Sequence, residues 1–285
     1  MVTADDFGIA VPVNEAIEQA HRNGILTAAS LMVAGDAASD AVARARRMPK
    51  LGVGLHLVLT RGRPCLDPAQ IPDLVDSGGE FARDLFRAGV NFFFRPAARA
   101  QLEAEIRAQF EAFRRTGLKL DHVNGHNHIH LHPTVIGLVL KLGREFGLSA
   151  VRVPYEPPLV SFLAAKEGFW RRLLPALGLL PWAAYLKWRI RRAGLGCNDY
   201  VFGIFDSGHM TAARISGFVS RLPAGVSEIY LHPAVAGWNG GDESAAGYDG
   251  AGELAALLDP RLAELLRKRG IAATAFSGLA AGAAR

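Results

Sequence analysis

The chain lacks most of the features that mark secreted, disulfide-rich or nucleic-acid-binding proteins. Its 285 residues include only 2 cysteines, Cys65 and Cys197, which lie far apart and outside any CxxC pattern. This usage excludes a disulfide-stabilised scaffold and is typical of a reducing compartment. The net charge is +5, yet no long run of lysine or arginine occurs, so we expect no nucleic-acid partner.

The N-terminus also lacks the pattern of an export signal. The first residues, MVTADDFG, place Asp5 and Asp6 where a signal peptide needs an apolar run, so we expect the protein in the cytoplasm. Half of the residues are apolar and 21% are charged, which is enough for a large core and excludes a disordered chain.

Strand-like and helix-like runs alternate along almost the whole chain. The clearest helix is expected over residues 97–117, where Leu102, Ile106, Phe110 and Phe113 recur at spacings of three and four. Eight runs look like strands: residues 1–4, 27–35, 51–60, 118–124, 149–154, 199–205, 227–233 and 271–276. Because parallel strands need crossovers, this alternation predicts an α/β fold. Eight strands favour a distorted (β/α) TIM-like barrel that forms a single domain over residues 1–285.

Two segments interrupt the alternation and are predicted to be insertions. Residues 61–96 are rich in proline, glycine and aspartate and are expected to form a lid-like loop. Residues 157–195 are expected to form an apolar and basic helical insertion, whose centre from Leu173 to Leu186 carries no charge. That centre is shorter than a membrane span, and Pro175 and Pro181 are expected to break it. Either it lies in a membrane interface, or it is a buried helical hairpin with its arginines in solvent.

Residues with catalytic or metal-binding chemistry lie within or directly after the strand-like runs at five places. They are Asp5 with Asp6, His56, the histidines between residues 122 and 132, Arg152, and His232. In a barrel, the loops after the C-terminal ends of the strands converge on one face, where active sites lie. Taken one at a time, the aspartates could serve as turn or N-cap residues and His56 as a buried core histidine. Their joint occurrence favours one shared site.

The stretch HVNGHNHIHLHP, from His122 to Pro133, holds five of the nine histidines. An extended backbone would turn those at positions 126, 128, 130 and 132 to one side, whereas a helix would align those at 122, 126 and 130. Pro133 disfavours helical geometry at the residue before it, so we expect an extended loop that enters a helix near Thr134. A catalytic zinc-type site takes three protein ligands, so the other histidines would orient ligands or touch substrate.

Four blocks of the sequence, TADDFG, GLHLVLT, HVNGHNHIH and YLHPA, resemble the signature blocks of the YdjC-like carbohydrate deacetylases. They occur in the same order and span nearly the full chain. The stretches LTAASLMVAG, FFFRPA and VRVPYEP are similar to the hopanoid-biosynthesis-associated branch of this family. The resemblance implies a barrel-type hydrolase that removes the acetyl group of an N-acetylated amino sugar. In that branch the substrate would be an N-acetylglucosaminyl hopanoid.

The resemblance also implies roles for single residues. Asp6, His56 and His126 match the metal-binding positions of the family, and Asp5 matches the catalytic base. His232 matches a late histidine that would act as a proton donor or substrate contact.

Three further residues belong to the same motifs. His128 and His130 are expected to contact substrate or to orient the ligands, and Arg152 could pair with Asp5 to hold it ionised. Family members usually begin the first strand several residues earlier, which implies either a start upstream of Met1 or a shortened strand.

The implied cofactor is one divalent metal ion. Two histidines and an aspartate suit zinc best, and also cobalt, nickel or manganese, while the resemblance adds magnesium. The expected substrate is a small or lipid-linked amino sugar, and the segment Leu173–Leu186 could contact the inner membrane surface. A homodimer is left open. The alternatives are a deacetylase of soluble chitooligosaccharides, a metal-dependent phosphoesterase, and a non-enzymatic protein that binds metal or sugar.

Overall fold

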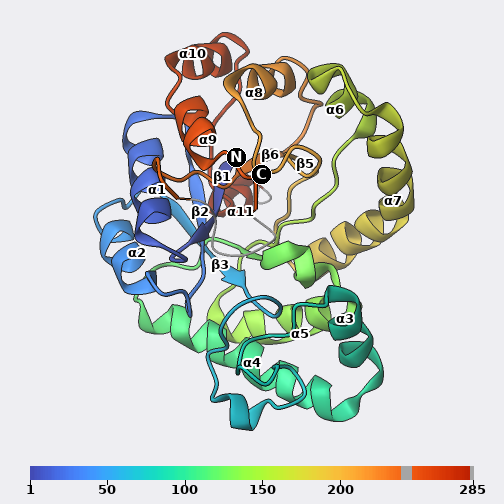
Figure 1. Cartoon of the computed structure of the whole chain (residues 1–285). Coiled ribbons are helices and arrows are strands. Elements are labelled where there is room, and N and C mark those ends of the chain that lie inside the picture. The colour runs from blue at the N-terminus through green and yellow to red at the C-terminus, as the bar shows by residue number, and fades with distance from the viewer. Residues whose placement is uncertain (239–245, 283–285) are drawn as a thin grey trace.

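The computed structural model describes residues 1–238 and 246–282, and its centre is a six-stranded parallel sheet (Figure 1). The strand order is β4-β3-β2-β1-β6-β5, and all neighbouring strands are parallel. The strands are β1 (Val2–Phe7), β2 (Ala28–Leu31), β3 (Gly52–Leu57), β4 (Val123–Gly125), β5 (Tyr200–Phe202) and β6 (Ser227–Leu231). Most of their residues are buried on both faces, as expected for a parallel sheet covered by helices.

Residues 149–155 lie between the two edge strands of this sheet. The backbone nitrogen of Val123 in β4 donates to the carbonyl of Ala150 at 3.0 Å, and the nitrogen of Val201 in β5 donates to the carbonyl of Tyr155 at 2.9 Å. The segment forms only isolated bridges and no continuous ladder. The sheet therefore curls into a distorted TIM-like barrel, and the predicted fold class is confirmed.

The last of the eight expected strands is absent. Residues 271–276 form no strand, because β1 already pairs with β2 on one edge and with β6 on the other. The segment is instead anchored to Asp121, whose carboxylate accepts from the backbone nitrogens of Phe276 and Ser277 at 3.1 and 2.8 Å. The Phe276 ring stacks on His122 with centroids 4.3 Å apart. Phe276 is thus buried against the barrel, whereas Ala272 and Ala273 of the same run are exposed.

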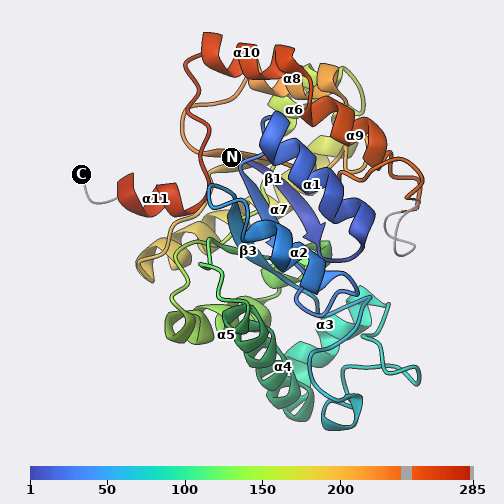
Figure 2. The ribbon, with the colours of Figure 1, turned by 90° about the vertical axis from the view of Figure 1, so that its left-hand side faces the viewer.

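Helices surround the barrel, and α4 and α5 lie side by side along one flank (Figures 1 and 2). The predicted apolar stripe of α4 is buried against the core. The helices are α1 (Val11–Asn23), α2 (Ala38–Ala45), α3 (Leu85–Phe94), α4 (Pro96–Arg115), α5 (Pro133–Gly143), α6 (Pro158–Ala165), α7 (Phe169–Arg192), α8 (Ala212–Val219), α9 (Gly250–Leu257), α10 (Pro260–Lys268) and α11 (Ser277–Gly282).

The first insertion contains a loop and the helix α3. Its loop is fixed by Glu105 of α4, whose carboxylate accepts from the backbone nitrogens of Cys65 and Leu66 at 2.9 and 3.0 Å. The second insertion contains α6 and α7, which pack against each other.

Helix α7 runs without a break through Pro175 and Pro181, so both the expected break and the buried hairpin were wrong. The helix persists because one stripe of it, including Ala183, Leu186 and Ile190, is buried against the body of the protein. Both prolines lie on the exposed side. No helix within the described residues is long and apolar enough to cross a membrane.

We expect Pro181→Ala to raise the free energy of unfolding by about 1–2 kcal/mol. An interior proline destabilises a helix by about 3 kcal/mol. Alanine also makes the unfolded chain more flexible, which reduces the gain in stability by about 1 kcal/mol. Urea denaturation of the purified protein measures the change. Pro96→Ala is the matched control. Pro96 is at the first position of α4, where a backbone N–H would have no acceptor within the helix, so proline costs little there. A variant less stable than the parent would contradict this expectation.

Candidate active site

The predicted site residues meet at the C-terminal ends of the strands. Asp5 and Asp6 are in β1, His56 is in β3, His126 directly follows β4 and His232 directly follows β6. All five line one cavity of about 290 Å³. The convergence expected from barrel geometry is therefore present.

Asp6, His56 and His126 form a buried group that could hold a metal ion. Their ligand atoms all lie within 4.8 Å of one another. Oδ1 of Asp6 is 3.2 Å from Nε2 of His56 and 3.3 Å from Nδ1 of His126. Nε2 of His56 makes no well-directed hydrogen bond there, as expected for atoms that point at a common third partner. Burial would raise the pKa of Asp6, but the two histidines outweigh it and hold that pKa well below its usual value.

A backbone irregularity explains how two consecutive aspartates both serve the site. Successive residues of a strand normally point to opposite faces. The pairing of β1 with β2 shifts register between Ala4 and Phe7, and Asp6 has a φ of 62° in the left-handed region. Such strained conformations cost about 1–3 kcal/mol and concentrate at functional sites. The irregularity turns Asp6 towards the histidines while Asp5 faces the barrel interior.

Asp5 is held by a buried arginine, as the sequence suggested. Nη1 and Nη2 of Arg152 donate to Oδ2 and Oδ1 of Asp5 at 2.6 and 2.9 Å. The same guanidinium donates to both oxygens of Glu228, at 3.0 and 2.7 Å. Burial disfavours the charged form of Asp5, but Arg152 outweighs it, so the pKa of Asp5 is lowered and its carboxyl stays ionised.

Asn124 and Ser30 connect Asp5 to His56, and the sequence analysis missed both. Oδ1 of Asn124 lies 2.8 Å from Nδ1 of His56, while its Nδ2 donates to Asp5 at 3.1 Å. Ser30 donates to Asp5 at 2.7 Å and lies 3.0 Å from the same His56 nitrogen. Because an amide oxygen only accepts, Nδ1 of His56 carries the proton and its Nε2 presents a lone pair towards Asp6. The place of Asn124 inside HVNGH was the one available signal.

The histidine stretch is not extended, so the expectation of four histidines on one side was wrong. Residues His126–Leu131 form short 3₁₀ turns interrupted by a kink at Asn127 and His128, which adopt left-handed conformations with φ of 51° and 55°. These two residues turn the chain within a few positions. Helix α5 does begin at Pro133, with Thr134 in its first turn, as expected.

The other histidines of the stretch therefore point to different surroundings. His128 packs edge-on against Tyr230 in the cavity, with centroids 5.6 Å apart, and Nε2 of His130 donates to the carbonyl of Arg152 at 3.0 Å. Burial, with Arg152 nearby, lowers the pKa of His128 to about 3 and that of His130 well below its usual value. Both are neutral at physiological pH. His122 bonds to Asp121 at 2.9 Å, outside the cavity.

His132 lies outside the cavity as well. It accepts from the backbone nitrogen of Thr134 at the start of α5, and its ring contacts the rings of Phe92 and Phe93 in α3. Its role is thus to join α3 to α5.

His232 has polar neighbours that the sequence did not reveal. Its Nδ1 lies 3.4 Å from the hydroxyl oxygen of Ser207, which is 3.0 Å from the hydroxyl oxygen of Tyr248. Its backbone nitrogen donates to Glu253 at 2.5 Å. Ser207, Tyr248 and Tyr230 line the same cavity as His232.

A buried charged group fixes the segment that carries Ser207. Glu156 accepts from the backbone nitrogens of Gly203 and Ile204 at 3.2 and 2.7 Å. Arg172 of α7 donates twice to Asp206, at 2.8 Å each. Burial raises the pKa of Glu156 from 4.5 to about 7. The second insertion is thereby linked to the wall of the cavity.

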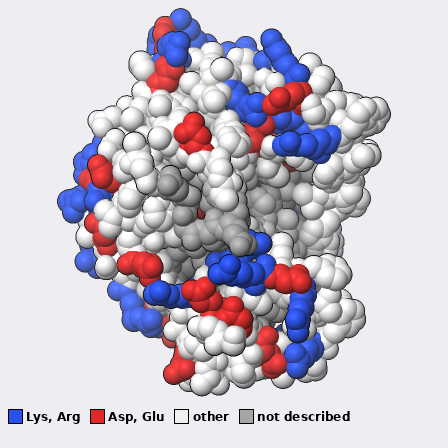
Figure 3. Space-filling view, viewed as in Figure 1, with Lys and Arg blue, Asp and Glu red and all other residues white. Residues whose placement is uncertain are grey.

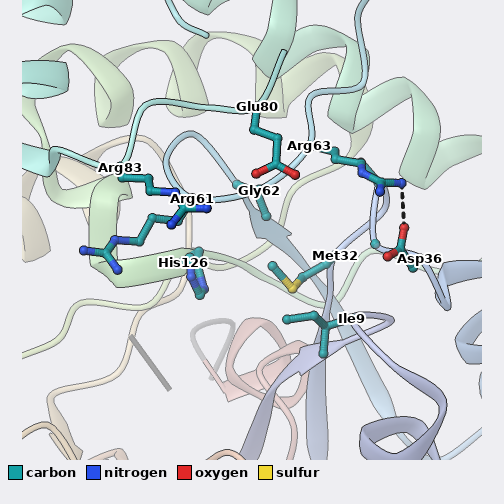
Figure 4. Close-up of a pocket in the computed structure, with 12 residues that line it drawn as sticks. Ile9, Met32, Asp36, Arg61, Gly62, Arg63, Glu80, Arg83 and His126 are labelled. Carbon is teal, nitrogen blue, oxygen red and sulfur yellow. Dashed lines mark hydrogen bonds and ion pairs between the residues drawn. The ribbon is translucent and has the colours of Figure 1, made fainter. Parts of the chain in front are cut away.

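A second cavity of about 410 Å³ adjoins the first and shares His126 with it. Figure 4 shows Arg61 and Arg83 near His126, with Ile9 and Met32 on the opposite side. This cavity extends the space next to Asp6, His56 and His126.

The comparisons with known proteins identify the family of this chain. The model of the family described as YdjC-like protein matches residues 1–268. The chain belongs to this family. A carbohydrate deacetylase of Geobacillus stearothermophilus is 32% identical over 272 residues, covering 95% of this chain and 94% of that protein.

Another relative matches over a shorter length. A carbohydrate deacetylase of Brevibacillus brevis is 42% identical over 158 residues, which cover 55% of this chain and only 58% of that protein.

A solved structure matches over nearly the full length. A crystal structure from Enterococcus faecalis, described in terms of cellobiose-phosphate cleavage, has a TM-score of 0.72 and 22% identity. It covers 98% of this chain and 97% of its own, and it supports the fold alone.

We expect Arg152→Met to lower the free energy of unfolding by about 3–5 kcal/mol, because it leaves Asp5 and Glu228 buried without a partner. Chemical denaturation at neutral pH measures this loss. Arg107→Met is the control, since Arg107 pairs with Glu145 on the surface and its loss should leave stability nearly unchanged. Equal stability of the two variants would show that the buried contact does not stabilise the barrel.

We expect stability to fall as pH rises from about 5 to 7, through the titration of Glu156. Its folded-state pKa is raised, so the folded protein binds this proton more tightly and loses that advantage as the carboxyl ionises. Glu156→Gln should flatten this part of the profile, and urea denaturation at a series of pH values measures it. An identical slope in the parent and the variant would contradict the assignment.

Proposed function

We propose that this protein is a metal-dependent carbohydrate deacetylase that hydrolyses the N-acetyl group of an amino sugar. The observation that carries the proposal is the buried group of Asp6, His56 and His126 beside an ionised Asp5 in one cavity. The membership in the YdjC-like family and the names of the relatives support the class of reaction.

The donor set fits a single divalent ion. Two imidazoles and one carboxylate suit zinc, and also cobalt, nickel or manganese, and the family resemblance keeps magnesium open. Asp6, His56 and His126 would hold the ion, with Asn124 keeping Nε2 of His56 unprotonated. When bound, such an ion lowers the pKa of water and polarises the acetyl carbonyl.

The remaining residues would move protons and place the substrate. Asp5 would accept the proton of the attacking water at Oδ2, which receives one hydrogen bond from Arg152, whereas Oδ1 accepts from Ser30, Asn124 and Arg152. His232 would give a proton to the departing amine. His128 is neutral because of its lowered pKa, so it would contact the substrate and not act as an acid.

The finer substrate assignment is an N-acetylglucosaminyl hopanoid. It rests on the resemblance of the sequence to the hopanoid-associated branch, and soluble chitooligosaccharides are the alternative. Incubation of the protein with N-acetylglucosaminyl lipid and with N-acetylglucosamine oligomers, followed by mass spectrometry, separates the two. We expect acetate release from the lipid, and release from the oligomers alone would overturn this assignment.

Two other classes are less well supported. A phosphoesterase with two ions needs further carboxylates, but Asp5 is committed to Arg152, and the group of Asp6, His56 and His126 suits one ion. A protein that only binds metal or sugar should keep its function when Asp5 is replaced by Asn, whereas a deacetylase should lose turnover.

We place the protein in the cytoplasm. Cys65 and Cys197 are both free, which suits a reducing compartment.

We expect Asp5→Asn to lower turnover by at least about 10²-fold while an ion still binds, because the base is removed and the ligands are kept. Acetate release measures turnover, and metal analysis of the purified variant measures binding. Asp6→Asn should weaken both, and Glu15→Gln on the exposed side of α1 is the control. Full turnover by Asp5→Asn would remove Asp5 from the mechanism.

A further inference from the structure

The exposed large apolar side chains of the described residues gather on three helices. On α3, Phe86 and Phe94 are 83% and 72% exposed, and on α7, Trp170 and Leu174 are 67% and 65% exposed. Val11 on α1 is the exception. We call the following set the apolar face: Leu85, Phe86, Val90, Phe93 and Phe94 of α3, Leu159 and Leu163 of α6, and Trp170, Leu174, Leu177, Leu180, Tyr185 and Trp188 of α7.

The three helices lie on the same side of the molecule. The indole of Trp182 in α7 donates to the carbonyl of Leu131 at 3.1 Å, while Phe92 and Phe93 of α3 contact the ring of the next residue, His132. Helix α6 packs against α7. Figure 1 shows α3, α6 and α7 along the right-hand side, and the right-hand margin of Figure 3 over α6 and α7 is largely free of charged side chains. Such a concentration of apolar surface marks an interaction site.

The charges on these helices have one sign. The sequences of α3, α6 and α7 contain no aspartate or glutamate, whereas α3 carries Arg87 and α7 carries Arg171 near its start and Lys187 with three arginines near its end. Arg172 is not part of this face, because it is buried and paired with Asp206. Arg191 is paired with Asp199, and Arg192 lies over the ring of Trp188. Exposed aromatic and leucine side chains beside basic groups are the composition of helices that lie in a membrane interface. Two copies of this face would bring like charges together, which disfavours self-association.

We propose that the apolar face docks on a lipid bilayer that contains anionic headgroups. The helices would lie along the interface, with the aromatic and leucine side chains in the headgroup and acyl boundary. Leu85 of α3 lines the active-site cavity, and Arg172 of α7 fixes the segment that carries Ser207. Docking would thus bring the cavity close to the lipid surface. The link to a lipid-bearing substrate rests on the proposed function, whereas docking depends on the surface alone.

Flotation of the full-length protein with vesicles tests the proposal without any substrate. We expect it to float with vesicles of phosphatidylcholine and phosphatidylglycerol, and less with phosphatidylcholine alone. Raising the salt concentration should weaken binding. The double variants Phe86→Ser with Phe94→Ser, and Trp170→Ser with Leu174→Ser, should each lower the vesicle partition coefficient by about tenfold or more. All four side chains are exposed, so the variants should fold.

The control is Val11→Ser, which removes an exposed apolar side chain outside the apolar face and should float like the parent. Equal partitioning of the parent and both double variants would overturn the proposal. A second outcome would also overturn it. In that outcome the parent does not float, analytical ultracentrifugation shows it to be a dimer, and the double variants are monomers. Acetate release is measured separately, so a protein that floats but releases no acetate would refute the enzyme assignment and leave docking intact.

Discussion

The buried guanidinium of Arg152 is the interaction on which the site depends. It makes four hydrogen bonds, to Asp5 on β1 and to Glu228 on β6, and the carbonyl of Arg152 accepts from His130. Removing three charged groups from water is costly, and only such well-directed pairing offsets the cost. Arg152 belongs to the irregular segment that joins β4 to β5, so the same side chain ties the barrel together and keeps Asp5 ionised.

The two insertions contain residues next to the active-site cavity and residues on the exposed surface. In the first insertion Leu85 of α3 lines the cavity, and in the second Arg172 of α7 holds Asp206 next to Ser207 of the cavity wall. Both helices also carry large apolar side chains that are exposed to solvent. The barrel strands need no such exposed surface, because the helices cover them on the outside. The insertions are therefore the part of the fold in which contact with a partner and access to the cavity can be joined.

The sequence predicted the barrel and the meeting of Asp5, Asp6, His56 and His126, because parallel strands place their C-terminal ends at one face. It failed where three-dimensional packing overrides local pattern. Helix α7 stays continuous through two prolines because one stripe of it is buried. Residues 271–276 form no strand because β1 is already paired with β2 and β6. Asn124 has no periodicity or spacing that reveals which side chains it joins. The catalytic and metal-binding roles of the site residues stay predictions.

At Asp6 the left-handed backbone lowers the stability of the fold, although the carboxylate belongs to the site. Glycine adopts this conformation most readily, and aspartate does so at a cost that the surrounding strands must bear. Random mutagenesis screened for thermal resistance would therefore drift towards glycine at residue 6. The enriched variants would be more stable to heat, but they would lack the carboxylate beside His56 and His126.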